Sequence, residues 1–108
     1  MAAPVTVSVG HQVQASIRYL DQNGNDMATS PTPDSPPSWT DVESPIGDMT
    51  LVVAADSMSA VETAVAAGTD VLTLALVVGG VSFSNTLPIT VTAAAQQLTS
   101  VDIVATVV

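Results

Sequence analysis

The stretch that decides the fold is residues 60–92, AVETAVAAGTDVLTLALVVGGVSFSNTLPITVT. Apolar residues alternate in it with Thr, Ser and Asp, and Gly68 and the pair Gly79-Gly80 interrupt the alternation. A period of two with turn formers between the runs is typical of antiparallel strands that present one face to a core. This stretch predicts a strand over residues 70–78 that returns through a Gly-Gly hairpin, and it contains no catalytic motif.

The same alternation predicts strands in the rest of the chain. Residues 5–9 form one short strand, and residues 13–19 form a second that places Arg18 on the solvent face. Further strands are expected over residues 38–42, 49–54, 81–84 and 87–91. The alternation therefore predicts an all-β chain.

Residues 57–68 are open to two readings. Ser59 and Glu62 have the spacing of a helix capping box, and Gly68 could end such a helix. Val61 and Thr63, however, are β-branched and continue the period of two. We favour a strand, because the segments on both sides are strands.

Two segments predict loops. Residues 21–26, DQNGND, combine turn formers with an Asn-Gly pair that can supply positive φ values. Residues 29–37 contain four prolines, which excludes a central strand. Trp39 follows this loop directly and is expected to anchor the core.

Composition limits the classes of function. The 108 residues suffice for one domain, and 47% of them are hydrophobic. Ten acids against one cation, Arg18, give a net charge of −9, which disfavours binding to the phosphates of nucleic acids. Disulfides and thiolate chemistry are excluded because the chain has no cysteine. We see no signal peptide and no apolar stretch long enough for a bilayer, so we expect synthesis in a cytoplasm and no membrane partner.

The acidic residues provide few candidate sites. Asp21, Asn23, Asn25 and Asp26 faintly resemble a calcium loop, but the sixth and twelfth positions hold Asp26 and Thr32 instead of Gly and Glu. We interpret the segment as an acidic turn that offers a candidate loop contact.

Other candidates for chemistry are weaker still. Asp41 and Glu43 lie two apart on one strand face, which we interpret as a solvated face, and His11 is a lone histidine. Gly79-Gly80 lacks the Lys of a phosphate loop. We therefore predict no catalytic residue, no cofactor, no metal site and no enzymatic activity.

The quoted segments together resemble a known family. Asp21-Gln22-Asn23-Gly24, Trp39 with Asp41, residues 64–69 (AVAAGT) and residues 89–92 (ITVT) occur in this order. The pattern is similar to the bacterial immunoglobulin-like domains of surface adhesins and of many phage virion proteins, over residues 5–92. The proline-rich loop is longer than usual in that family, and the tail lies outside the pattern.

The resemblance implies a single Ig-like antiparallel β-sandwich with Greek-key connections and about seven to nine strands. The domain would span residues 1–108, with a core at 5–92, an N-terminal arm at 1–9 and a β-prone tail at 98–108. Arm and tail are hydrophobic: the tail either adds an edge strand to the domain or reaches into a neighbouring subunit, and both segments are candidates for subunit contacts. The candidate contact residues are Val5, Val7, Val9, Leu98, Val101, Ile103 and Val107.

We expect a non-enzymatic structural protein of a virion, most simply a phage capsid decoration or cement protein made in the host cytoplasm. Its partners would be the major capsid protein or other virion subunits, with several copies forming a homo-oligomer on the particle. An adhesion module that binds glycan or a host protein through residues 21–26 and 29–37 is the alternative.

Overall fold

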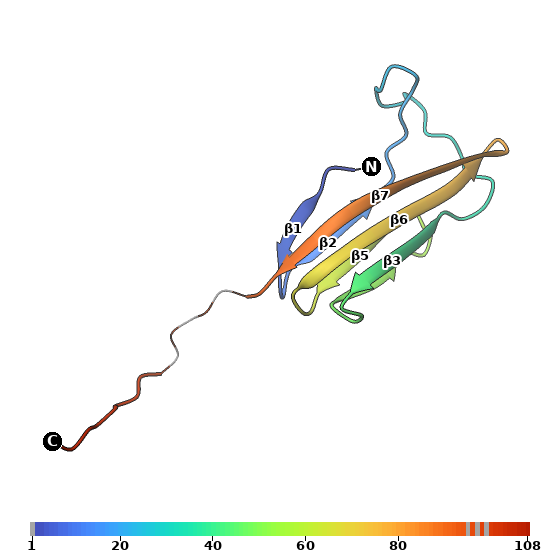
Figure 1. The fold of residues 1–108 in the computed structure, drawn as a ribbon. Coiled ribbons are helices and arrows are strands. Elements are labelled where there is room, and N and C mark those ends of the chain that lie inside the picture. Colours follow the sequence, from blue (N-terminus) through green and yellow to red (C-terminus); the bar gives the residue numbers. More distant parts are fainter. Residues whose placement is uncertain (1, 95, 97, 99) are drawn as a thin grey trace.

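The computed structural model describes residues 2–94, 96, 98 and 100–108. In this part of the chain seven strands form two sheets (Figure 1). The strands are β1 (Val5–Ser8), β2 (Gln12–Ser16), β3 (Ser38–Ser44), β4 (Met49–Val53), β5 (Ser59–Ala64), β6 (Gly68–Val78) and β7 (Val81–Thr92). No helix able to span a membrane occurs among the described residues.

The two sheets have the strand order of an immunoglobulin-type sandwich. One sheet has the order β1-β7-β6-β3 and the other β2-β5-β4. The chain changes sheet between β1 and β2, β2 and β3, β3 and β4, and β5 and β6, which gives Greek-key connections. The predicted Ig-like, all-β sandwich with Greek-key connections is therefore confirmed.

One strand pair corrects the expectation of a purely antiparallel fold. β1 runs parallel to β7, with Val5 opposite Ile89 and Val7 opposite Val91. The physical reason is that the chain turns at Gly10 (φ 91°) into the opposite sheet, so β1 is not the arm of a hairpin. Its direction is set instead by packing of its valines at the edge beside β7.

The core lies between the sheets and is built from apolar side chains without aromatic rings. Its buried members are Val7, Met49, Ala64, Leu72, Ile89 and Val91. Trp39 packs against this cluster and donates a hydrogen bond from Nε1 to the carbonyl oxygen of Ser57, at 2.8 Å. Trp39 is thus the core anchor that the sequence predicted.

The strand boundaries refine the sequence prediction. Residues 59–64 form a strand, so the helical alternative is wrong. β7 runs unbroken over residues 81–92, where we predicted two strands. β2 ends at Ser16, and an isolated bridge between Leu20 and Asp26 continues the pairing around the predicted turn.

The β6–β7 hairpin is longer than the strands of the facing sheet (Figure 1). Leu72 is buried, whereas Val81 and Phe83 near the turn are more than half exposed. Core burial therefore explains only the first half of the apolar run 71–81. In the far half residues 76–78 are half-buried, and Val81 and Phe83 face solvent beyond the reach of the shorter sheet.

The proline-rich loop is tied to the tip of this hairpin. The backbone N–H of Asp34 donates to the carbonyl oxygen of Val77, at 2.7 Å. Its carboxylate accepts hydrogen bonds from the N–H groups of Gly79 and Gly80, at 3.0 and 2.8 Å. The loop and the hairpin turn consequently form one end of the domain, and β7 leads away from it to the opposite end.

Candidate functional site

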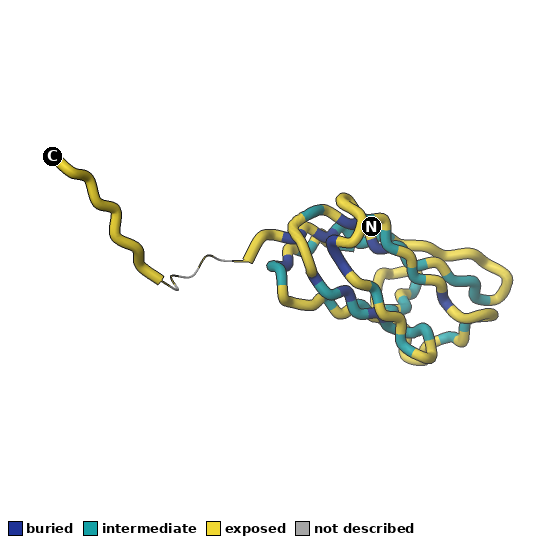
Figure 2. The backbone as a smooth tube through the Cα atoms, turned by 90° about the horizontal axis from the view of Figure 1, so that it is seen from below, coloured by how far each residue is buried: buried dark blue, intermediate teal, exposed yellow. Residues whose placement is uncertain are grey.

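The C-terminal segment leaves the sandwich at the end of β7 (Figure 1). Within the described part of the chain, residues 100–108 belong to no strand and are exposed throughout, as Figure 2 shows. Val101 and Ile103 are 84% and 87% exposed, and Leu98 and Val107 are exposed as well. The four candidate contact residues of the tail therefore all face solvent.

The order of residues in the segment is that of a strand. Val101, Ile103, Ala105 and Val107 share one parity, so in an extended chain they lie on one wholly apolar face. The other parity is mixed, with Ser100, Asp102 and Thr106 among the apolar Leu98, Val104 and Val108. An amphipathic strand of this kind becomes stable only when its apolar face is covered and its backbone is paired.

The N-terminal arm is placed differently. Val7 is buried, and Val5 and Val9 pack against the core. The apolar side chains of the arm are therefore used inside the domain. What the arm offers to a neighbour is the free backbone edge of β1, because β1 is the outermost strand of its sheet.

Residues 21–26 form the predicted exposed turn. Asp21 Oδ1 accepts hydrogen bonds from the backbone N–H groups of Asn23 and Asn25, at 2.8 and 3.0 Å. Asp26 forms an ion pair with Arg18. The two carboxylates of the turn are thus engaged by donors of the protein itself.

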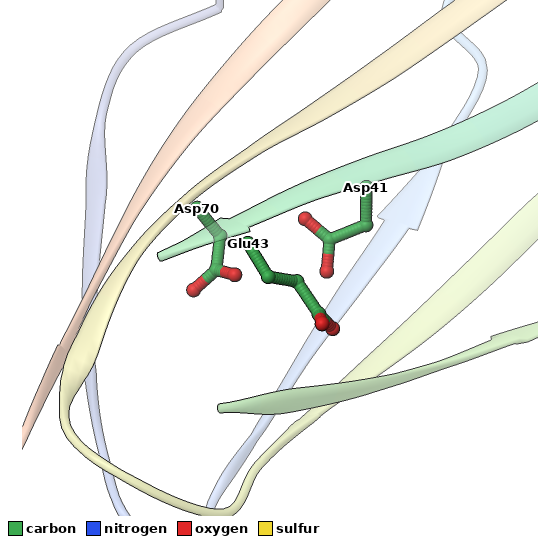
Figure 3. Close-up of side chains that lie close together, drawn as sticks. All are labelled: Asp41, Glu43 and Asp70. Carbon is green, nitrogen blue, oxygen red and sulfur yellow. The ribbon is translucent and has the colours of Figure 1, made fainter. Parts of the chain in front are cut away.

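A second group of acids lies inside the sandwich, where no site was predicted. Asp41 and Glu43 of β3 and Asp70 of β6 point into the space between the sheets (Figure 3). Each offers one carboxylate oxygen, and these oxygens all lie within 4.8 Å of one another. Asp48, from the turn before β4, and Glu62 of β5 approach from the opposite sheet. We call Asp41, Glu43, Asp48, Glu62 and Asp70 the buried acidic cluster.

Three members of the cluster are almost completely shielded from water. Glu62, Asp48 and Asp70 are 0%, 1% and 2% exposed. Neither oxygen of these three carboxylates, nor of Asp41, has a hydrogen-bond partner among the described residues. A carboxylate can then bond only to a neighbouring carboxylate, and this requires that one of the two holds a proton.

The shielding shifts the acidity of the cluster. Burial, with a further contribution from Asp41 and Asp70, raises the pKa of Glu62 from 4.5 to about 8. Burial, with a further contribution from Asp48 and Asp41, raises the pKa of Asp70 from 3.8 to about 7. Burial also raises the pKa of Asp41. Near neutral pH the cluster therefore retains protons that exposed carboxyl groups would have lost.

The backbone around the cluster is arranged to bring these acids together. The N–H of Gly47 donates to Glu43 Oε2, at 2.7 Å, and the carbonyl oxygen of Asp48 accepts from Val65 N–H, at 2.8 Å. Gly68 lies directly against the turn, where an added Cβ would overlap Asp48 Oδ2 and the carbonyl oxygen of Ser44. A glycine at the start of β6 is thus required for the turn and the strand to approach this closely.

The cluster corrects the solvated-face interpretation of Asp41 and Glu43, which lie on the inner face of β3. A signal for this was present in the sequence. Trp39, Asp41 and Glu43 have the same parity, so a core position for Trp39 also directs the two acids inward. Glu62 likewise shares its parity with the buried Ala60 and Ala64.

No protein-family model matches the chain, and no curated protein matches it significantly. The function therefore has to be argued from the exposed C-terminal segment, the loops and the buried acidic cluster.

Proposed function

We propose that the chain is a non-enzymatic structural protein of a virus particle that binds a neighbouring subunit through residues 98–108. The observation that carries the proposal is the exposed apolar alternation of this segment beside a sandwich that already has its own core. An unpaired strand of this composition is a template for pairing with another chain. We infer that the segment adds a strand to a sheet of its neighbour.

The energetics favour a full strand of contact. Burying a Val or Ile side chain contributes about 1.5–3 kcal/mol, and each backbone hydrogen bond contributes about 1 kcal/mol net. Ordering the segment costs about 1–2 kcal/mol per residue. The burial of one side chain cannot offset the cost of ordering the whole segment. Val101, Ile103 and Val107 therefore have to be buried together along the acceptor strand.

The assignment to a phage capsid, as a decoration or cement protein, is supported by the resemblance of residues 5–92 to immunoglobulin-like domains of virion proteins. The partners would be the major capsid protein or other virion subunits, with homo-oligomers of this chain on the particle. A net charge of −9 is consistent with a protein on the outer surface of a virion that avoids nucleic acid.

An adhesion module is the second candidate, favoured by the position of the loops. The exposed turn at residues 21–26 and the loop at 29–37 belong to the connection that projects from the sandwich, whereas β7 leads to the opposite end of the domain (Figure 1). A chain held by its C-terminal segment would present these loops outward, where they could bind glycan or a host protein.

Reconstitution onto purified particles that lack the chain tests the proposal. We expect the intact protein to bind with a fixed stoichiometry and a variant without residues 98–108 to fail. Ile103→Lys should weaken binding at least about 30-fold, corresponding to the loss of about 2 kcal/mol of apolar burial. Thr106→Lys, on the mixed face, is the matched control and should bind nearly as the parent does.

Unchanged stoichiometry after deletion of residues 98–108 would refute the role of the segment. Strong and specific signals on a glycan array, lost when residues 21–26 are replaced, would favour the adhesion module instead.

A further inference from the structure

We infer that the buried acidic cluster binds one divalent cation, with calcium as the ion that its chemistry fits, and that this ion ties the two sheets together. The site lies inside the sandwich and is separate from the C-terminal segment, so it stands independently of the proposed function.

The buried carboxylates of the cluster have no partner for their charge within the described part of the chain. Glu62, Asp48 and Asp70 are at least 98% buried, and their oxygens have no hydrogen-bond donor among the described residues. Removing an ionised carboxylate from water without a partner costs several kcal/mol. A group of such carboxylates therefore requires a compensating positive charge or retained protons.

No Lys or Arg side chain of the protein provides this charge. Arg18 is the only Lys or Arg in the sequence, and it forms its ion pair with Asp26 in the exposed turn. In a structure with abundant basic residues, an acidic cluster is ordinarily balanced by Lys or Arg. Here the balance has to come from solution.

The spacing of the carboxylate oxygens also fits a single ion. Two ligands on opposite sides of a calcium ion, each at about 2.3–2.6 Å, are separated by about 4.6–5.2 Å. The ligand oxygens of Asp41, Glu43 and Asp70 lie within 4.8 Å of one another, a separation that falls within the span of oxygens around a single calcium ion. Magnesium, at about 2.0–2.1 Å, spans at most about 4.2 Å between opposite ligands and demands stricter octahedral geometry, so it tolerates a narrower range of oxygen positions than calcium does.

The ligand type also selects a hard cation. The five side chains offer only carboxylate oxygens, no histidine belongs to the group, and the chain has no cysteine. Zinc and copper sites are built mainly from nitrogen and sulfur, whereas calcium takes six to eight oxygens. Mono- or bidentate coordination by these carboxylates can supply that number with little or no water.

The origin of the ligands gives the ion a structural role. Asp41, Glu43 and Asp70 come from the four-stranded sheet, and Asp48 and Glu62 come from the side of the three-stranded sheet. An ion between them replaces repulsion across the interior with attraction to a common centre. We therefore expect calcium to stabilise the folded state by linkage.

Thermal unfolding of the full chain with calcium chloride as the probe tests the inference. The chain is first stripped with EGTA and then scanned without metal, with about 10 mM calcium and with about 10 mM magnesium, above the about 1 mM dissociation constants of weak calcium modules. At about 10 times the dissociation constant, calcium stabilises the folded state by about 1.4 kcal/mol and should raise Tm by at least about 5 °C. Magnesium should have a smaller effect.

Terbium luminescence gives a second readout. Trp39 and Asp41 are on the same face of β3, about 7 Å apart along the strand, so excitation of Trp39 should sensitise a terbium ion bound in the cluster. Added calcium should displace terbium and quench this emission. The signal reports on the site directly and does not depend on protein stability.

The variant Glu62→Gln tests the inference, because it removes a buried charge and keeps the volume of the side chain. This variant should unfold at a higher temperature than the parent in EGTA at pH 8, and calcium should shift its Tm much less. Asp21→Asn with Asp26→Asn, in the exposed turn, is the control and should retain the full calcium shift. The inference is overturned if calcium leaves the parent's Tm unchanged, or if Glu62→Gln keeps the parent's calcium shift and terbium signal.

Discussion

Raising the pH should destabilise the calcium-free protein through Glu62. The pKa of this residue is about 8 in the folded chain against an ordinary 4.5, so the folded state binds its proton more tightly than the unfolded state does. A group of this kind contributes stability that is complete below its unfolded pKa and is lost as the pH rises through its folded pKa. The free energy of unfolding should therefore fall between about pH 5 and 8 and then level off.

The size of the loss follows from the shift. At about 1.4 kcal/mol per pKa unit, Glu62 alone sets an upper limit of about 5 kcal/mol. Asp70, whose pKa is raised from 3.8 to about 7, titrates over an overlapping range and acts in the same direction. Water that enters the cluster lowers the free-energy cost of ionising the buried carboxyl groups. We therefore expect the free energy of unfolding to fall by about 2–4 kcal/mol between pH 5 and 8. With an m-value of about 2 kcal/mol/M, the urea midpoint falls by about 1–2 M.

The assay is equilibrium unfolding in urea with EGTA present, followed by the fluorescence of Trp39. Glu62→Gln should reduce the fall in stability with pH, because its amide does not titrate while Asp70 still does, and it should be more stable than the parent at pH 8. Asp102→Asn, in the exposed tail, is the matched control and should keep the parent's pH dependence. Equal urea midpoints for the parent at pH 5 and pH 8 would refute the reasoning.

Three further substitutions test the packing. Gly68→Ala should lower the free energy of unfolding by at least about 2 kcal/mol, because its Cβ would overlap Asp48; an unchanged Tm would mean that the turn is not held against β6. Asp34→Ala should cost about 1–3 kcal/mol and speed proteolysis of the proline-rich loop, since two hydrogen bonds to the β6–β7 turn are lost; an unaltered cleavage rate would contradict this. Trp39→Phe should cost about 1 kcal/mol in urea unfolding through the lost bond to Ser57, and a neutral effect would show that this bond contributes nothing.

The strands could be predicted because the period of two is a local property of the chain. Residues 70–78 and their Gly79-Gly80 turn carry this signal within a few positions, and the two glycines have the positive φ values (58° and 78°) that a tight turn uses. The parallel pairing of β1 with β7 has no such local signal. It joins segments more than 80 residues apart and is decided by packing at the edge of the finished sheet.

The buried acidic cluster was only partly accessible to sequence reasoning. Parity places Asp41 on the same face as Trp39, and this could have identified it as an inward-facing acid. The meeting of Asp48 and Glu62 with Asp70 could not be inferred, because it depends on how a turn and a strand of one sheet face the other sheet. Because charged residues usually lie at the surface, we predicted that these acids face solvent. The way in which the two sheets pack places them inside the sandwich instead.

The central claim is that residues 98–108 become a strand of a neighbouring subunit. Amide hydrogen exchange over this segment, measured in the free protein and in the purified particle, tests it most directly. In the free protein these amides should exchange at the rate of an unstructured chain, because residues 100–108 belong to no strand. In the particle, alternate amides should be strongly protected as they pair with the acceptor strand. Exchange in the particle as fast as in the free protein would contradict the claim.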